Sequence, residues 1–269
     1  MNSSAGPLIS IVTPVYGGAC LEALYQRVVT AVSSISDNLE IVMVNDASPD
    51  NAWETIGLLA RADARVRGID LADNVGQHVA ILAGLDHARG QWVVVMDCDL
   101  QDRPEEIPRL YQAAGDEFDI VLARRIVRQH AGLRLLGSKA FYAVLRLITG
   151  IRQDHTVGNF GLYRRPAIEA ILANRERYYF PLLVRSVAFS TTSIDVQHDV
   201  SKVPSSYSVA KLINLALITI RANCPGVSTR QLANVPEKRN VYRVRRLCGA
   251  GTQEVEFPLL RQSRHNALP

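Results

Sequence analysis

The sequence lacks any hydrophobic run long enough to cross a membrane. Its longest apolar stretch, residues 212–220, falls far short of the roughly 18 residues that a spanning helix needs. The N-terminal residues contain neither the basic segment nor the apolar segment of a secretory signal. These absences predict a cytoplasmic protein with no signal peptide and no transmembrane helix.

Cysteine is scarce, and the common phosphate-binding glycine motifs are missing. The four cysteines show no CxxC spacing, which indicates free thiols in a reducing compartment. The chain has no GxxxxGKS/T motif, which argues against an ordinary ATPase. It has no GxGxxG after its first apolar run, which argues against a nicotinamide or flavin enzyme. A bound diphosphate would therefore have to be held by side chains and a metal ion.

What the sequence does contain is a regular alternation of apolar runs and helical segments. Runs typical of buried strands occupy residues 9–15, 39–44, 66–71, 92–96 and 118–123. Helical segments of about ten residues or more between them predict βαβ units with right-handed crossovers. Because continuous apolar strands are covered on both faces, we expect an α/β fold in three layers, with a mainly parallel sheet between two layers of helices.

The pattern changes beyond residue 124. We predict helices at 133–149, 165–174 and 208–222, a short strand at 158–163 and an edge strand at 192–196. The net charge is +4, but residues 221–269 carry nine Lys or Arg against three Asp or Glu, and periodicity fades there. We therefore predict one domain over 1–225 and a basic C-terminal tail of low order over 226–269.

Negative charge is crowded at the end of the fourth predicted strand, in the stretch WVVVMDCDLQD. If the strand stays extended, Asp97, Asp99 and Gln101 point to one side and Cys98 points to the core. Two adjacent carboxylates repel each other unless a cation lies between them, and oxygen donors of this kind suit Mg²⁺ or Mn²⁺. The simpler interpretation is a solvated turn, and we expect Asp102 to cap the next helix.

Other charged side chains are expected near the same edge of the sheet. The strands that end at Asp46 and Asp70 are acidic at their carboxyl ends, where open parallel sheets bind ligands. Residues 120–153 contain seven Lys or Arg and no Asp or Glu. A cation site beside arginines suits a nucleoside-diphosphate leaving group and a second anion. Nucleic acid is the weaker interpretation, because the run lacks interleaved aromatic residues and a known motif.

These motifs resemble those of the inverting glycosyltransferases of family 2, which have the GT-A fold. Among them they are similar to polyprenyl-phosphate glycosyltransferases such as dolichol-phosphate mannose synthase. The matching pieces are TPVY at 13–16, VNDASPDN at 44–51, NVGQHVA at 74–80, MDCDLQDRPE at 96–105 and SKAFY at 138–142. The resemblance covers about 8–225 and implies a nucleotide-binding half at 8–125 and an acceptor-binding half at 126–225. It implies metal-dependent sugar transfer from a nucleotide-sugar donor to a polyprenyl phosphate or lipid-linked glycan in cell-envelope polysaccharide synthesis.

The resemblance also implies roles for individual residues. Donor-binding residues would be Pro14, Tyr16, Asp46, Asn74, Gly76, Asp97, Asp99, Arg125, Arg128, Ser205 and Tyr207. Acceptor-binding residues would be Arg134, Ser138 and Asn159. The metal, Mg²⁺ or Mn²⁺, would be held by Asp97, Asp99 and Gln101. The catalytic group would comprise Asp97, Asp99 and Arg134, with Asp154 as the candidate base if the acceptor is a hydroxyl. The sequence departs from the family at Gly17 and Gly18, where an acid is common, and at Val200, where an arginine is usual.

Several alternatives stay open. A nucleotidyltransferase would also use a metal and a nucleotide, but would release pyrophosphate. A non-catalytic sugar-nucleotide-binding protein would bind the donor without transferring or hydrolysing it. The helix predicted at 208–222 suits either a membrane surface, which would place the protein at the inner face of the plasma membrane, or packing on the body or on a partner in a homo-oligomer.

Overall fold

The computed structural model describes residues 7–126, 156–175, 179–199, 242–249 and 252–256. Within this part of the chain, nine strands form one sheet. The strands are β1 (Ile9–Val15), β2 (Leu39–Asn45), β3 (Val66–Leu71), β4 (Trp92–Val95), β5 (Ile120–Arg125), β6 (Val157–Arg164), β7 (Thr191–Val196), β8 (Val244–Gly249) and β9 (Thr252–Glu256). The helices are α1 (Leu21–Ser33), α2 (Ala52–Ala62), α3 (Gln77–His87), the 3₁₀ helix η1 (Pro104–Glu106), α4 (Ile107–Ala114), α6 (Arg165–Ala173) and α7 (Phe180–Ser186).

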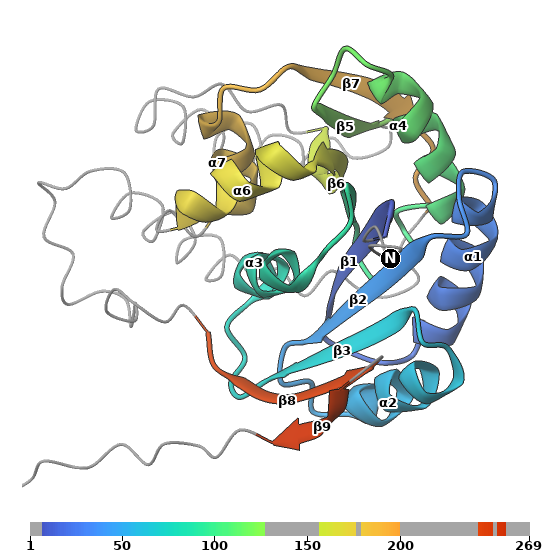
Figure 1. The fold of residues 1–269 in the computed structure, drawn as a ribbon, viewed down its shortest axis with the longest axis vertical. Coiled ribbons are helices and arrows are strands. Elements are labelled where there is room, and N and C mark those ends of the chain that lie inside the picture. The colour runs from blue at the N-terminus through green and yellow to red at the C-terminus, as the bar shows by residue number, and fades with distance from the viewer. Residues whose placement is uncertain (1–6, 127–155, 176–178, 200–241, 250–251, 257–269) are drawn as a thin grey trace, which may run out of the picture.

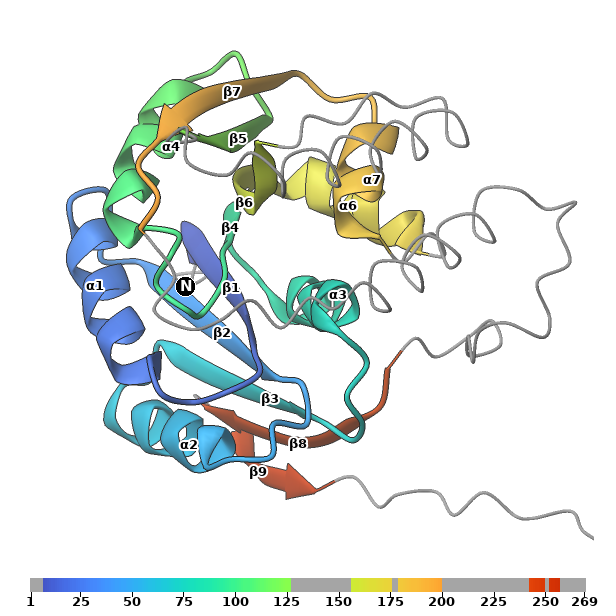
Figure 2. The ribbon, with the colours of Figure 1, turned by 180° about the vertical axis from the view of Figure 1, so that it is seen from behind.

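The sheet has a parallel centre and antiparallel flanks. Its strand order is β7-β5-β6-β4-β1-β2-β3-β8-β9. Strands β4, β1, β2 and β3 are parallel to one another, and β5 is parallel to β7. Strand β6 runs antiparallel between β4 and β5, and β8 runs antiparallel to both β3 and β9. Figures 1 and 2 show α1, α2 and α4 on one face of the sheet and α3, α6 and α7 on the other. The predicted α/β class and three layers are confirmed.

Alternation along the central strands divides the core in two. Every residue of β1 and β2 is buried. Ile11 and Met43 pack into the cluster under α1, α2 and α4, whereas Val12 and Val42 pack into the cluster under α3, α6 and α7. Helix α3 approaches β1 so closely that a Cβ added to Gly84 would lie 2.4 Å from Cγ1 of Val12.

The C-terminal region differs from its prediction. Low order throughout 226–269 was expected, but β8 and β9 extend the sheet beside β3. The physical reason is that β8, between β3 and the edge strand β9, is held by arginines as well as by apolar residues, so it carries no apolar run. Helix α7 was also missed, whereas the edge strand predicted at 192–196 is confirmed as β7.

Two predicted helices, at 133–149 and 208–222, lie outside the described residues. The division of the domain into halves at residue 125 stays a prediction. None of the helices in the described ranges has the length and apolar character needed to span a membrane.

Candidate active site

The loops after β1 and β2 are tied to each other at the carboxyl edge of the sheet. The backbone N of Gly17 donates to Oγ of Ser48 (2.9 Å), and that of Gly18 donates to Oδ2 of Asp50 (2.8 Å). The hydroxyl of Ser48 in turn donates to Oδ1 of Asp50 (2.7 Å). Gly17 has a φ of 112°, and a Cβ on Gly18 would lie 2.9 Å from Cα of Ala52. The two glycines that depart from the family pattern therefore build a tight loop that a side chain would strain.

Asp46 fixes the loop that precedes α3. Its carboxylate is buried and accepts the backbone N–H groups of Val75 (2.8 Å) and Gly76 (2.9 Å). Burial raises the pKa of Asp46, and the two hydrogen bonds oppose that rise. Since both oxygens are engaged by backbone, Asp46 acts here as a support for the loop, and its expected contact with a nucleoside stays a prediction.

The Asp97 carboxylate is held by amide groups from two elements. Nε2 of Gln77, the first residue of α3, donates to Oδ1 of Asp97 at 2.5 Å. The side chain of Asn159 on β6 makes a second hydrogen bond to Asp97. Asp46 therefore helps to position the Asp97 carboxylate indirectly, because it holds the loop that leads into Gln77.

The acidic motif does not continue the strand. Strand β4 ends at Val95, and a turn follows in which Leu100 has a φ of 64°. The prediction that Asp97, Asp99 and Gln101 point to one side of an extended strand is therefore wrong, because the strand ends before Asp97 and a turn with a left-handed residue follows. The turn folds Gln101 back on Asp99, with its backbone N donating to Oδ1 (3.0 Å) and its Nε2 to Oδ2 (2.5 Å).

Cys98 takes no part in the carboxylate cluster. It packs against the core cluster under α1, as the sequence predicted. Burial raises the pKa of its thiol to about 12, so the thiol stays protonated near neutral pH. Cys20 and Cys248 are also free thiols.

Asp102 is a buried ion-pair partner and not a helix cap. Its side chain is 1% exposed, with Oδ1 at 3.2 Å from Nη2 of Arg125 and at 3.6 Å from Nε2 of His198. Its Oδ2 accepts the backbone N–H of Asp97 (3.4 Å), and its backbone forms an antiparallel bridge with His198. The cap position of η1 is Arg103, and no side chain caps it. The cap prediction is wrong because the carboxylate turns inward to the arginine of β5.

The cluster contains more negative than positive charge. Burial raises the pKa of Asp97 to about 7, with Asp102 and Asp99 adding to the rise and Arg125 opposing it. Burial and Arg125 lower the pKa of His198, so its imidazole is neutral at pH 7. Arg125 is paired with Asp102 and offsets the charge of Asp97 only in part. Among the described residues, no ion pair joins Asp97 or Asp99 to a cation.

These carboxylates fit a divalent cation. Neighbouring carboxylates whose mutual repulsion is only partly offset suit Mg²⁺ or Mn²⁺, because a bound cation takes the place of the proton on Asp97. Across the described ranges, no three His, Cys, Asp or Glu side chains gather as a metal site. The remaining ligands would then be phosphate and water oxygens, which is the usual arrangement for Mg²⁺ beside a nucleotide.

Asp70, at the end of β3, is also buried but already neutralised. It accepts hydrogen bonds from Nδ2 of Asn45 (2.7 Å) and from Nε of Arg246 on β8 (2.7 Å). The guanidinium of Arg246 lies over the ring of Trp53, with Cζ 4.9 Å from the ring centroid. Strand β8 thus supplies the countercharge of an acid at the carboxyl edge.

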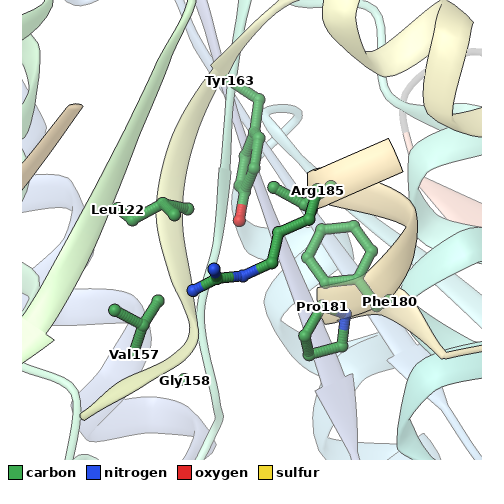
Figure 3. Close-up of a pocket in the computed structure, with 8 residues that line it drawn as sticks. Leu122, Val157, Gly158, Tyr163, Phe180, Pro181 and Arg185 are labelled. Atoms are coloured by element: carbon green, nitrogen blue, oxygen red, sulfur yellow. The ribbon is translucent and has the colours of Figure 1, made fainter. Parts of the chain in front are cut away.

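A small open pocket lies next to the amino end of β6. It is lined by Leu122, Val157, Gly158, Tyr163, Phe180, Pro181, Val184 and Arg185. Figure 3 shows the Arg185 side chain extending from α7 toward Leu122 and Val157. Gly158 also borders Arg125, since a Cβ added there would lie 3.0 Å from Nη2 of Arg125. The pocket therefore adjoins the charged cluster.

The remaining predicted residues divide into two groups. Pro14 is buried within β1, Tyr16 is 61% exposed just beyond it, and Asn74 is exposed before the loop that Asp46 holds. The others lie outside the described residues, namely Arg128, Arg134, Ser138, Asp154, Ser205 and Tyr207, and so does Val200, where the sequence departs from the family pattern.

Sequence reasoning missed three residues of this cluster. Gln77 stood inside the motif at 74–80 and Asp102 inside the acidic motif, but no pattern showed what either would contact. No sequence pattern predicted the contact of His198 with Asp102, because the backbone bridge between these two residues joins distant parts of the chain.

Comparison with known proteins gives the family. The family model described as "Glycosyl transferase family 2" matches residues 10–172. The undecaprenyl-phosphate 4-deoxy-4-formamido-L-arabinose transferase of Aeromonas hydrophila is 37% identical over 231 residues, which cover 84% of this chain and 71% of that protein. The protein of the same name from Shewanella sediminis is 38% identical over 223 residues, covering 81% and 67%. This chain belongs to glycosyl transferase family 2, and the predicted enzyme class is confirmed.

Solved structures agree on the fold. Glucosyl-3-phosphoglycerate synthase from Mycobacterium tuberculosis, in complex with phosphoglyceric acid, superposes with a TM-score of 0.54 at 18% identity and covers 81% of each chain. The same enzyme with Mn²⁺, uridine-diphosphate-glucose and phosphoglyceric acid gives 0.53 at 17% identity, with 81% and 80% covered. The GT-A fold is thus confirmed, and the Mn²⁺ and nucleotide sugar are ligands of that neighbour.

Proposed function

We propose that this glycosyltransferase moves a sugar from a nucleoside-diphosphate donor to a prenyl phosphate, with Mg²⁺ or Mn²⁺ as cofactor. The observation that carries the proposal is the pair of carboxylates, Asp97 and Asp99, whose charge is only partly offset because the nearby Arg125 is paired with Asp102. Negative charge grows on the diphosphate as the glycosidic bond breaks, so the enzyme must stabilise it. A bound divalent ion would supply that stabilisation as a Lewis acid.

The chain's own residues would prepare this site in advance. Asp97 and Asp99 would hold the ion, and Gln101 lies against Asp99. The amides of Gln77 and Asn159 restrain the Asp97 carboxylate, so little reorganisation is needed when the donor arrives.

The acceptor is proposed from the relatives and from the charge of the site. Both relatives described above are named for undecaprenyl phosphate. A phosphate acceptor is already anionic near neutral pH, so its attack needs no general base. Arg125 places a cation at the reacting edge, next to β6. Because a prenyl chain is apolar, this acceptor would bring the enzyme to a membrane surface.

The test is transfer of radiolabelled sugar to undecaprenyl phosphate in detergent micelles. The donors would be UDP- and GDP-linked sugars, including 4-deoxy-4-formamido-L-arabinose, each with Mn²⁺, with Mg²⁺ or with EDTA. We expect lipid-soluble label only with the metal, and loss of transfer in Asp99→Asn. The matched control is Asp37→Asn, which changes an exposed acid before β2 at the opposite end of the sheet.

Two results would contradict the proposal. Release of pyrophosphate in place of a nucleoside diphosphate would identify a nucleotidyltransferase. Donor binding with neither transfer nor donor hydrolysis, across the whole panel, would identify a non-catalytic binding protein.

A further inference from the structure

Arg125 lies within the electrostatic reach of two carboxylates. Its Nη2 is 3.2 Å from Oδ1 of Asp102, and its charge also acts on Asp97. Asp102 is 1% exposed and has no side-chain amide partner among the described residues, whereas Asp97 is held by the amides of Gln77 and Asn159. A buried charge with no partner is costly, so the arginine stabilises most at Asp102.

The surroundings of Arg125 keep it in that position. A Cβ at Gly158 would lie 3.0 Å from Nη2 of Arg125, so the guanidinium fills the space that a side chain would occupy. On the other side, His198 faces Asp102, but its imidazole is neutral and cannot replace the arginine. The backbone bridge between Asp102 and His198, with the N–H of Asp199 donating to O of Gln101 (2.9 Å), fixes the carboxylate relative to the acidic turn.

We propose that Asp102 is a positioning residue that keeps the Arg125 guanidinium off Asp97, and so leaves the acidic pair its two negative charges for a divalent cation. This inference rests on the proposed metal-dependent function. The Arg125 guanidinium and the divalent ion compete for Asp97, because a guanidinium freed from Asp102 would pair with Asp97 and repel the ion.

The first variant removes the charge of Asp102 and keeps its shape. In Asp102→Asn, Arg125 has no buried carboxylate to pair with and turns to Asp97. By Coulomb's law, a single positive charge about 5–10 Å from a divalent ion, at an effective dielectric constant of about 20, corresponds to an Mn²⁺ affinity at least about a hundredfold weaker.

The second variant separates competition from simple damage. The double variant Asp102→Asn with Arg125→Gln has neither charge, so the acidic pair is again uncompensated. We expect its Mn²⁺ affinity to return to within about threefold of the wild type. A residue that merely held the fold together would show no such recovery.

The matched control breaks a similar ion pair on the same strand. Asp195→Asn removes the partner of Arg124, the residue before Arg125, where Nε and Oδ1 are 2.5 Å apart. Both side chains of this pair are about half exposed, so their charges are screened by solvent, and we expect unchanged Mn²⁺ affinity and unchanged transfer.

Binding is measured as the loss of the free Mn²⁺ signal in electron paramagnetic resonance, with the full chain and UDP present. Circular dichroism and the thermal midpoint report the fold of each variant. The inference is overturned if the wild type binds Mn²⁺ and Asp102→Asn binds it equally well. It is also overturned if the double variant binds Mn²⁺ as weakly as Asp102→Asn does. If Asp102→Asn does not fold, the double variant is compared with the wild type, and Mn²⁺ binding much weaker than that of the wild type overturns the inference. A wild type that binds no Mn²⁺ refutes the proposed function instead.

Discussion

Replacing Asp97 should have opposite effects on transfer activity and on the stability of the metal-free protein. Burial and neighbouring carboxylates raise its pKa from 3.8 to about 7 in the metal-free protein. Replacing Asp97 by Asn removes the charge and keeps an oxygen that can accept the hydrogen bond from Gln77. We expect Asp97→Asn to lose transfer activity and yet to be more stable than the wild type above pH 7 when no metal is present.

The magnitude follows from proton linkage. Between pH 4 and pH 7 the unfolded chain has lost the Asp97 proton while the folded chain keeps it, so folding stability falls as the pH rises. Each pKa unit corresponds to about 1.36 kcal/mol, and a shift from 3.8 to about 7 therefore corresponds to at most about 4 kcal/mol. The contribution is fully present below pH 4 and is lost as the pH rises through 7.

The assay is urea unfolding in EDTA at pH 5 and at pH 8. The wild type should lose stability between the two values by about 2–4 kcal/mol more than Asp97→Asn does. Adding Mn²⁺ at pH 8 should restore the wild type and leave the variant unchanged, because the ion replaces the proton as the countercharge. Asp37→Asn, at an exposed site, is the matched control. Equal pH dependence in the wild type and Asp97→Asn would refute the reasoning.

Three further substitutions test the supports of the site. Asp46→Ala removes the acceptor of two backbone N–H groups and should lower the free energy of unfolding in urea by about 2–4 kcal/mol. Calorimetry should also show weaker binding of the nucleotide-sugar donor. If both values stay unchanged, Asp46 does not support the loop before α3. Arg246→Ala removes the charged hydrogen bond to the buried Asp70 and leaves Arg245, whose Nη1 is 3.9 Å from Oδ2, as the remaining cation, so it should cost about 1.5–3 kcal/mol, and adding Asp70→Asn should recover part of the loss. Gly84→Ala forces a methyl group against Val12 and should lower stability by about 1–3 kcal/mol, so a thermal midpoint equal to the wild type would contradict the close approach.

The sequence allowed the fold class and the acidic pair to be predicted for the same reason. Strands buried on both faces leave continuous apolar runs, as in β1 and β2, and acids at their ends stand out against that background. The geometry of the acidic motif could not be predicted. The reversal depends on the left-handed conformation of Leu100, a residue type that rarely adopts it.

The role of Asp102 shows a second limit. An aspartate two residues before a proline that begins a helix has the pattern of a cap, and the same pattern is compatible with an inward-facing carboxylate. The outcome was decided by partners far along the chain, Arg125 and His198, which reach Asp102 from β5 and from the segment after β7. Spacing within one motif carries no information about such contacts.

The arginines of this protein help to determine where a cation can bind. Four acidic sites lie at the carboxyl edge of the described sheet, at Asp46, at Asp70, at Asp102 and at the pair of residues 97 and 99. Backbone N–H groups occupy both oxygens of Asp46, Arg246 of β8 pairs with Asp70, and Arg125 of β5 pairs with Asp102. Strand β8 lies beyond residues 10–172, which the family model matches, so this part of the arrangement comes from the chain's own C-terminal segment. Because the other three carboxylates already have partners, a divalent ion gains most at the acidic pair. The arginines beside Asp70 and Asp102 thus help to leave Asp97 and Asp99 as the acids that a cation can use.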